Sequence, residues 1–425
     1  MPDQSPHSLT GNSLRVCMIV TNDMSSDSRV ARHAKTLGLE GYQVTVVCRL
    51  SERTEDTERC EGYKIVRVHS EVANYLTAID QHLAAPTVEQ DYHERTRFLL
   101  TKRKNLSWVA RLFLRLARIV FVQLAFLREA RKTGAHIYCA NDLDTLLLAV
   151  LAGSFDRRVV YDSHELWPDM LVGVPAFLKR ILHSYEGALI KRVHAVMTVN
   201  EFIADELATR YSIRDPVRVV YNCALPEKLT KEGPLRRKNQ KVKVALYHGW
   251  YSPERGLENL ARASEFLSPD VLLLFRGAGK LEKDLRALAS GKRNVRFEPP
   301  VDVNRVVEVA RRADVGIVPY LPTNLCNYYA SPNKLFEYLE AGLPIAVSNL
   351  PFMRKVIMES DIGTLFDARD PRSIAEALNK ITRPSHLDRY RKNIPLARKR
   401  YNWNVESEKL LGIYAELLGS RAPIG

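Results

Sequence analysis

Short apolar runs alternate with amphipathic stretches along most of the chain. Residues 15–20 and 43–48 are runs of the first kind, and the apolar positions of residues 28–40 between them recur at helical spacing. A strand, a helix and a strand in this order predict a right-handed βαβ unit in a parallel sheet. The first half contains more such strands, which we expect at residues 63–69, 136–140, 158–162, 195–199 and 217–221.

The alternation restarts after residues 224–241, which are polar and basic, as linkers are. We therefore expect an α/β protein with two Rossmann-like, doubly wound domains, residues 1–223 and 242–400, rather than one large sheet. Residues 70–107 show no clear period, and we interpret them as an insertion in the first domain. Strands of the second domain are expected at residues 243–248, 271–275, 295–298, 315–320 and 345–347.

The stretch 331–348 predicts a helix followed by a strand. Ser331 is a favourable N-cap, and Pro332 suits the first helical position because its missing N–H is not needed there. Lys334 is a cation in the first turn, where the helix dipole disfavours positive charge, and a bound phosphate would resolve that conflict. Glu337 lies one turn further on the same face, where a carboxylate can accept hydrogen bonds from a ribose diol. The alternative is a solvated surface pair that contributes little to stability, and the spacing leaves both interpretations open.

Several polar residues of the first half follow a predicted strand, at the edge where open α/β sheets bind ligands. His164 and Glu165 follow one strand, and Asp142 follows another. Asp27 and Arg29 lie where the loop after the first strand enters the next helix. Asp27 is also a natural N-cap, and capping explains it without a ligand. For His164, a hydrogen bond to Glu165 that only holds the loop is the alternative to a place in a reaction centre.

A second group of candidates ends the predicted strand at residues 271–275. Arg276 offers a planar fork to a phosphate group. Gly277 and Gly279 allow the backbone to approach a ligand closely. A Gly-x-Gly pair is a weak signal on its own, and a tight turn explains it equally well.

The composition is that of an ordinary globular chain, with 425 residues, 46% of them apolar and 26% charged. The six cysteines are scattered without a Cys-x-x-Cys pair, which favours a reducing compartment and predicts no metal site. Residues 1–12 are polar and lack the apolar core of a signal peptide, and no apolar run is long enough to span a membrane. We therefore expect a cytoplasmic protein.

The 63 basic and 49 acidic residues give a formal net charge of +14, which favours anionic partners. No signature of a nucleic-acid-binding fold accompanies this charge, so nucleic acid is not an expected partner. The segment from Trp108 to Leu127 is the most hydrophobic, and it has Arg111, Arg115 and Arg118 on one helical face. Such a helix suits an anionic lipid surface, here the inner face of the membrane. The alternative is a helix that packs on the sheet with its arginines in water, and the two interpretations are compatible.

The phrase Lys334-Leu-Phe-Glu-Tyr resembles the nucleotide-sugar signature of glycosyltransferase family 4, whose members are retaining enzymes with the two-domain GT-B fold. The resemblance implies that Glu337 holds the ribose of a nucleotide-diphosphate sugar and that Lys334 faces its diphosphate. Ser331 and Asn333, in the same stretch, are assigned to the donor as well.

The chain departs from the family pattern at two donor positions. The family often has a second glutamate where this chain has Tyr329, and Asn327 is the candidate substitute. The family usually has an arginine after the glycine that ends the first strand of the donor domain, where this chain has Trp250. Arg255 fits the next basic position of the pattern, and the resemblance implies that it meets the diphosphate.

Two phrases of the first half also resemble the family. The phrase Tyr-Asp-Ser-His-Glu implies that His164 borders the transferring sugar, which makes His164 the first candidate for a catalytic group and Glu165 the second. The phrase around Asp27 and Arg29 implies an acceptor cleft beside the first loop, to which we also assign Asp142. The Gly-Gly pair that many relatives carry in this loop is missing here.

The resemblance implies two domains that face each other across a cleft, and a last helix in residues 401–425 that crosses back to the first domain. The expected activity is transfer of a hexose from a nucleotide-diphosphate sugar to a glycan, lipid-linked or small-molecule acceptor, with retention. No Asp-x-Asp phrase is assigned to a metal ion, so basic residues are expected to replace a divalent cation, and no cofactor is expected. Two alternatives stay open: a nucleotide-sugar epimerase of the same fold, and a non-catalytic protein that binds a membrane surface.

Overall fold

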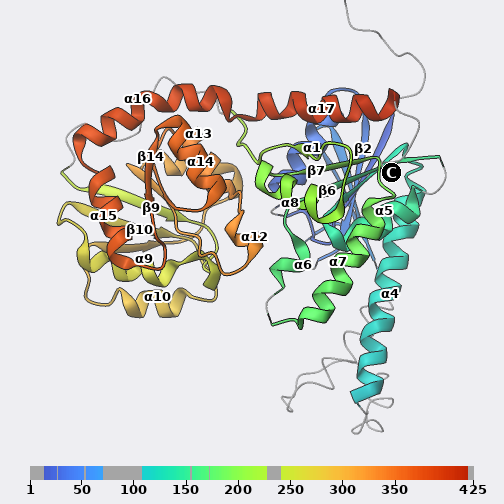
Figure 1. Ribbon diagram of the computed structural model, residues 1–425, viewed down its shortest axis with the longest axis horizontal. Helices are drawn as coiled ribbons and strands as arrows, with labels where there is room; N and C mark the ends of the chain where they lie inside the picture. Colours follow the sequence, from blue (N-terminus) through green and yellow to red (C-terminus); the bar gives the residue numbers. More distant parts are fainter. Residues whose placement is uncertain are drawn as a thin grey trace, which may run out of the picture. The chain divides into compact units, whose positions relative to one another are not determined.

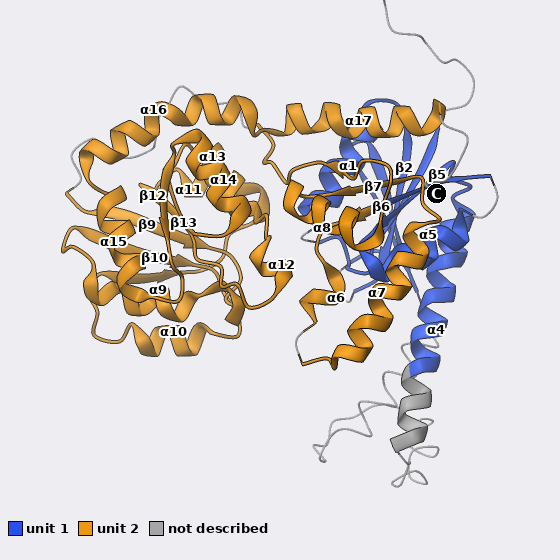
Figure 2. Cartoon of the chain, in the orientation of Figure 1, with its two compact units in different colours: residues 1–161 blue, residues 162–425 orange. Residues whose placement is uncertain are grey.

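The computed structural model describes residues 14–25, 27–51, 54–69, 108–153, 156–171, 173–226 and 241–419, and within its first long helix the side chains from residue 116 onward. The chain divides into two compact units, Met1–Tyr161 and Asp162–Gly425 (Figure 2). The expected insertion at residues 70–107 and most of the expected linker lie outside the described residues.

The first unit is built of parallel strands and the helices that connect them (Figure 1). Its elements are β1 (Arg15–Ile19), α1 (Ser28–Leu39), β2 (Gln43–Arg49), β3 (Thr57–Cys60), β4 (Tyr63–Val68), α4 (Trp108–Lys132), β5 (Ile137–Asn141), α5 (Leu143–Ala152) and the first residues of β6 (Arg158–Ser163). β1 pairs in parallel with β2 and β5, and β4 pairs in parallel with β2. β3 is antiparallel to β4. The central strands are rich in Val, Ile, Cys and Ala and are buried, as strands covered on both faces are.

The second unit begins with elements that continue the same alternation. These are α6 (Trp167–Met170), α7 (Ala176–Ile190), β7 (Ala195–Thr198), α8 (Glu201–Tyr211) and β8 (Arg218–Val219). The second series of strands comprises β9 (Lys243–His248), β10 (Val271–Arg276), β11 (Val295–Glu298), β12 (Val315–Val318), β13 (Ile345–Ser348) and β14 (Gly363–Phe366). Helical segments of this series are η1 (Pro253–Arg255), α9 (Leu257–Ala263), η2 (Ser264–Phe266), α10 (Glu282–Leu288), η3 (Val303–Arg305), α11 (Val306–Ala310), α12 (Leu325–Tyr328), α13 (Asn333–Glu340), α14 (Pro351–Ser360), α15 (Pro371–Ile381), α16 (Pro384–Arg400) and α17 (Trp403–Gly419).

The strands form two sheets. The first has the order β3-β4-β2-β1-β5-β6-β7-β8, and the second has the order β11-β10-β9-β12-β13-β14. The pairs of the second sheet are parallel. Its order is that of a doubly wound Rossmann fold, in which the winding direction reverses between the first and fourth strands, here β9 and β12. The predicted α/β class with two such sheets is confirmed.

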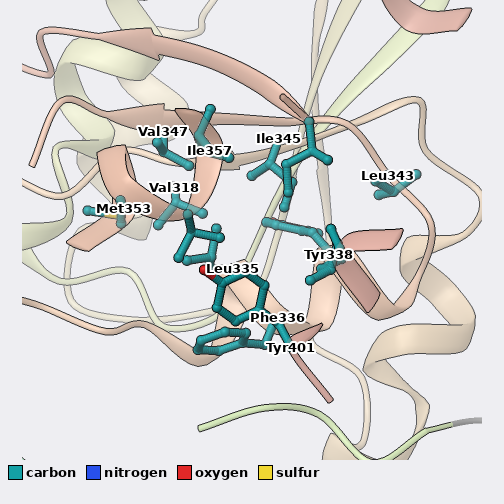
Figure 3. Close-up of a cluster of buried hydrophobic side chains, with 14 of the residues drawn as sticks. Val318, Leu335, Phe336, Tyr338, Leu343, Ile345, Val347, Met353, Ile357 and Tyr401 are labelled. Carbon is teal, nitrogen blue, oxygen red and sulfur yellow. The ribbon is translucent and has the colours of Figure 1, made fainter. Parts of the chain in front are cut away.

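Each face of the second sheet supports its own hydrophobic core. Leu246, Val318 and Ile345 face one core, which α13, α14 and α16 complete (Figure 3). The adjacent residues Tyr247 and Ala346 face the other core, which α9, α10 and α15 complete. Neighbouring residues of one strand point to opposite faces, so this alternation follows from the pleat of the sheet.

The sequence placed the start of α13 one residue too early. Its first helical residue is Asn333, and Pro332 occupies the N-cap position in extended conformation. Ser331 therefore lies outside the helix, and its side chain does not cap it. The apolar stripe of the helix is as predicted, because Leu335 and Phe336 are fully buried in the core of Figure 3.

The last helix packs on the segment that follows β8. The backbone N–H of Trp403 donates to the carbonyl of Ala224 at 3.3 Å. The buried carboxylate of Glu406 accepts a hydrogen bond from the backbone N–H of Tyr221 at 2.9 Å. α17 is thus fixed to the segment that follows β8, and the predicted domain limits stay a prediction.

Candidate functional site

The phenol of Tyr338 fixes α13 against the end of β9. This buried side chain donates to the carbonyl of Leu246 at 2.9 Å and accepts from the backbone N–H of His248 at 3.1 Å. Gly316 of β12 makes room for the ring, because a Cβ at that position would overlap it. The helix is therefore held where the winding direction of the sheet reverses, which is where such sheets bind ligands.

Lys334 and Glu337 lie on the face of α13 opposite the buried stripe. Lys334 Nζ is 5.5 Å from the centre of the Tyr247 ring. A Cβ on Gly249, the residue after β9, would stand 2.7 Å from that same Nζ atom. Gly249 has φ of 119°, a conformation that favours glycine. The ammonium group is thus packed over bare backbone at the carboxyl end of the sheet.

The ends of β9 and β10 come together beside this lysine. The backbone N–H of Gly249 donates to the carbonyl of Arg276 at 2.9 Å, and that of Tyr251 donates to the carbonyl of Ala278 at 2.8 Å. A Cβ on Gly277 would overlap the carbonyl oxygen of Gly249. Gly277 therefore allows the two loops to approach each other closely, and its predicted approach to a ligand stays a prediction.

The surroundings of Lys334 disfavour its charged form. Burial and the charge of Arg255 lower its pKa, Glu337 opposes the shift, and the resulting pKa is about 8. The guanidinium of Arg255 lies 4.0 Å from the centre of the Tyr320 ring, at the carboxyl end of β12. Two cations therefore face one region of the sheet edge, and a multiply charged anion there would stabilise the charged form of Lys334.

Glu165 belongs to the same neighbourhood. Its Oε2 atom accepts from the thiol of Cys326 in α12 at 3.5 Å. Burial raises the pKa of Tyr320 to about 12, and the charges of Glu165 and Glu337 act in the same direction while Arg255 opposes them. The second unit thus brings Glu165 within electrostatic reach of the residues around Lys334.

His164 has a different partner from the one that sequence reasoning considered. Its Nε2 atom lies 3.2 Å from Oδ2 of Asp162, whose side chain is fully buried. The side chain of His164 is 16% exposed, so one edge of the ring is accessible. A buried carboxylate that orients a partly exposed imidazole suits a group that holds or moves a proton.

Family models match both halves of the chain. Residues 28–227 match the model described as Glycosyltransferase Family 4, and residues 242–383 match the model described as Glycosyl transferases group 1. The chain belongs to glycosyltransferase family 4. The family resemblance that the sequence motifs predicted is confirmed.

Curated relatives of this family 4 chain cover part of it. The phosphatidyl-myo-inositol mannosyltransferase of Mycobacterium leprae is 29% identical over 188 residues, which are 43% of this chain and 49% of that protein. The D-inositol 3-phosphate glycosyltransferase of Acidothermus cellulolyticus is 28% identical over 198 residues, 42% of either protein. The chain spans about half the length of the curated relatives it matches.

Solved structures resemble the whole fold. Sucrose-phosphate synthase from Thermosynechococcus elongatus has a TM-score of 0.69 at 15% identity, over 96% of this chain and 100% of that one. Anabaena HepE, solved in complex with UDP-glucose, has a TM-score of 0.62 at 13% identity, over 95% of this chain and 100% of that one. At these identities the likeness shows the GT-B fold alone.

Three of the predicted donor residues of this family 4 chain have partners within the protein. Arg276 forms an ion pair with Glu298 of β11. Asn327 donates from its side chain to the hydroxyl of Thr323 at 2.8 Å. Asn333, the first residue of α13, also has an interaction within the protein, although its buried Oδ1 atom accepts no hydrogen bond from a described residue.

Ser331 has no such partner. Its buried hydroxyl oxygen lacks a hydrogen bond to any described residue, just ahead of the first turn of α13. A polar atom buried in that position is available to a ligand at the helix N-terminus.

Tyr329, where the family often has its second glutamate, packs elsewhere. Its ring stacks on Phe202 with centroids 5.9 Å apart, and its carbonyl accepts from the side chain of Asn200 at 2.7 Å. The aromatic residue therefore holds α12 against the start of α8. Trp250, in the position of the usual arginine, is 63% exposed.

The predicted acceptor residues lie in the first unit. Asp27 caps α1 by accepting from the backbone N–H of Val30 at 3.0 Å, and it also accepts from Asn22 at 2.7 Å. Capping, the alternative explanation, is thus what Asp27 does. Arg29 is 3% exposed, and Asp142 follows β5 with a positive φ of 68°. A positive φ at a non-glycine residue is a strained conformation, and such residues cluster at functional sites.

Sequence reasoning missed Asp162, Tyr338 and His248. Asp162 is the penultimate residue of β6 and His248 is the last residue of β9, where a polar residue looks like the ordinary end of an apolar strand. The signal was present at Asp162, because an aspartate two residues before a candidate histidine at a strand end is a candidate orienting group. The partners of Tyr338 are some ninety residues away, so nothing local indicates its role.

Proposed function

We propose that the chain transfers a sugar from a nucleotide-diphosphate sugar to a hydroxyl group of an acceptor. The observation that carries the proposal is the position of Lys334, whose ammonium is packed over Gly249 where the second sheet reverses direction. Burial and Arg255 lower the pKa of this cation, and a bound diphosphate would stabilise its charged form. Glu337, one turn further on, is in place to accept from the two hydroxyls of a ribose.

In the proposed reaction, the bond between the anomeric carbon and a diphosphate oxygen breaks. The acceptor oxygen bonds to that carbon, and its proton leaves with the nucleoside diphosphate. Lys334, Arg255 and the first backbone amides of α13 stabilise the negative charge that develops on the diphosphate. His164, oriented by Asp162, is assigned to the sugar side, with Glu165 next to it. Retention of configuration and independence from a metal ion remain expectations from the family resemblance.

The names of the relatives support the classes of donor and acceptor. Two act, by name, on a phosphatidyl-inositol and on an inositol phosphate, and HepE was solved with UDP-glucose. We infer a nucleotide sugar as donor and a glycan, a lipid-linked or a small phosphorylated polyol acceptor.

The test combines binding with product analysis. UDP-glucose, UDP-galactose, GDP-mannose and ADP-glucose are screened by thermal shift, and the best donor is incubated with myo-inositol, inositol 3-phosphate and phosphatidylinositol. The proposal expects a shift with one donor class and release of nucleoside diphosphate that depends on an acceptor. A donor converted to its epimer without any acceptor establishes the epimerase instead. Absence of a shift with every nucleotide sugar contradicts both enzymes.

We further propose that α4 lies at the polar–apolar interface of an anionic membrane. Leu116, Val120 and Leu124 recur every four residues on this helix and are each 53–54% exposed, and Phe121 is 45% exposed. The opposite side of the helix buries Phe126 in the core. Both predicted roles of the segment are thus compatible. The side chains of Arg111 and Arg115 lie outside the described residues.

The second unit has an exposed apolar face of its own on α7. Phe177 and Ile181 are 61% and 57% exposed, and Arg180 between them is also exposed. Neighbouring apolar and basic residues of this kind favour an anionic lipid interface. Among the described helices, none combines the length and apolar character needed to cross a bilayer.

Vesicle flotation tests the membrane proposal. The protein is expected to float with vesicles of phosphatidylglycerol and to stay behind with phosphatidylcholine alone. Replacement of Leu116, Val120 and Leu124 by serine should reduce flotation severalfold. The matched control replaces Leu147 and Leu151, two exposed leucines of α5, by serine. This control variant should float like wild type. Equal flotation of both variants contradicts the role of α4.

A further inference from the structure

His248 is a buried histidine at the edge of the proposed donor site. It is the last residue of β9 and is 7% exposed. Its backbone N–H donates to the phenol of Tyr338, and its ring meets the Tyr338 ring edge-on with centroids 4.8 Å apart. The ring position is therefore fixed by the residue that follows Glu337 in α13.

The Nε2 atom of His248 faces Glu337. It lies 3.2 Å from Oε2 of that carboxylate. The two atoms are within hydrogen-bonding distance but not aligned, and Nε2 has no other hydrogen-bond partner among the described residues. A rotation of the Glu337 carboxylate that brings Oε2 into line with the Nε2–H bond would complete the hydrogen bond. A buried N–H without a partner is costly, which favours that rotation.

The surroundings of His248 favour a neutral imidazole. Burial holds the pKa of His248 well below its usual range, and the charges of Lys334 and Arg276 act in the same direction. A neutral imidazole with its proton on Nε2 donates one hydrogen bond and adds no charge. Glu337 therefore keeps its negative charge, which strengthens the hydrogen bonds it accepts from a ligand.

We propose that His248 is a positioning residue that holds the Glu337 carboxylate in the orientation in which it accepts the two ribose hydroxyls of the donor. The inference rests on the proposed function, because Glu337 belongs to the proposed donor site. The carboxylate is 21% exposed, so its remaining surface is accessible to a ligand. The family resemblance assigns no role to this position, and the assignment comes from the contacts of this chain.

The experiment measures how strongly the site distinguishes a ribose from a ribose without hydroxyls. Dissociation constants of UDP, GDP and ADP are measured with the full chain by calorimetry, and the tightest is compared with its 2′,3′-dideoxy analogue. Wild type should prefer the ribonucleotide at least tenfold. His248→Leu should reduce that preference about fivefold, by weakening the ribonucleotide and leaving the dideoxy analogue unchanged. His248→Gln, which restores a neutral N–H donor, should recover most of the preference.

The outcomes separate the two proposals. A wild type that binds none of the three nucleotides overturns the proposed function, and the role of His248 with it. Wild-type discrimination that His248→Leu leaves intact overturns the role of His248 alone. Equal weakening of both nucleotides in His248→Leu also overturns it, because a merely structural defect acts on both. His248→Met serves if the leucine variant does not fold.

A measurement on the wild type needs no folded variant. In ¹⁵N-histidine spectra, the resonance that is lost in His248→Gln or His248→Met should show a neutral ring protonated on Nε2. A ring protonated on Nδ1, or on both nitrogens, at pH 7 contradicts the proposal.

Discussion

Lys334 Nζ occupies the space that a side chain on Gly249 would need, because a Cβ at that residue would stand 2.7 Å from it. The glycine is therefore part of the binding site although it has no functional group. Its φ of 119° adds a second reason for glycine, so the two effects of a substitution need to be separated.

Gly249→Ala should displace the ammonium and weaken nucleoside diphosphate binding at least tenfold, as measured by calorimetry. The matched control is Gly291→Ala, since Gly291 has φ of 75° and nothing within 4 Å of its Cβ position. Both variants should lose about 1 kcal/mol of unfolding free energy from the strained backbone. Binding that is as strong in Gly249→Ala as in Gly291→Ala contradicts the packing of Lys334 over the backbone.

Lys334→Met should make the ligand-free protein more stable at pH 7. The pKa of Lys334 is lowered from 10.5 to about 8 in the folded state, so its protonated form is less favourable there than in the unfolded chain. The cost is full below pH 8 and disappears as pH rises to 10.5, because the unfolded state binds more protons in that window. We expect a gain of about 1–2 kcal/mol at pH 7, after allowance for the partly exposed side chain.

Chemical denaturation at several pH values checks this result. The stability difference between Lys334→Met and wild type should shrink between pH 8 and pH 10.5. Added nucleoside diphosphate should raise the melting temperature of wild type and not that of the variant. A variant that is less stable than wild type at pH 7 contradicts the lowered pKa.

Donor affinity should fall as pH rises through about 8, because the free protein loses the Lys334 proton there. The diphosphate itself is fully ionised in this range, so its own titration does not produce the effect. Lys334→Arg keeps its charge at every accessible pH and should bind with an affinity that changes little between pH 7 and pH 9.5. Calorimetry across this range distinguishes the two profiles, and a flat profile in wild type argues against Lys334 as the anion contact.

Glu406→Ala should destabilise the attachment of α17. The fully buried carboxylate accepts from the backbone N–H of Tyr221 at 2.9 Å and from Lys409 at 2.8 Å. Loss of a buried charge-assisted acceptor should cost about 2–3 kcal/mol of unfolding free energy. Glu408→Ala, on the exposed side of the same helix, should cost little. Equal melting temperatures of the two variants contradict the anchoring role.

Local patterns were sufficient for the architecture. The apolar strands are buried on both faces, so alternation of apolar runs with amphipathic stretches predicted two parallel sheets. The stripe that includes Leu335 and Phe336 predicted which face of α13 is buried, and this placed Lys334 and Glu337 on the opposite face.

The partners of the candidate residues were not predictable in the same way. Arg276 pairs with Glu298 because the two residues lie opposite each other in the adjacent strands β10 and β11. This neighbour is known only once the order and register of the strands are known. Ser331 fails to cap because Pro332 takes the N-cap position, a difference of one residue.

One measurement tests the central claim most directly, namely that Lys334 and Glu337 together hold a nucleoside diphosphate. Calorimetry compares Lys334→Ala/Glu337→Ala with Lys380→Ala/Glu376→Ala, a pair of exposed residues one turn apart on α15. The control pair should bind UDP, GDP or ADP like wild type, and the α13 pair should lose binding by a factor of at least one hundred. Equal affinity of the two double variants would contradict the assignment of the donor site.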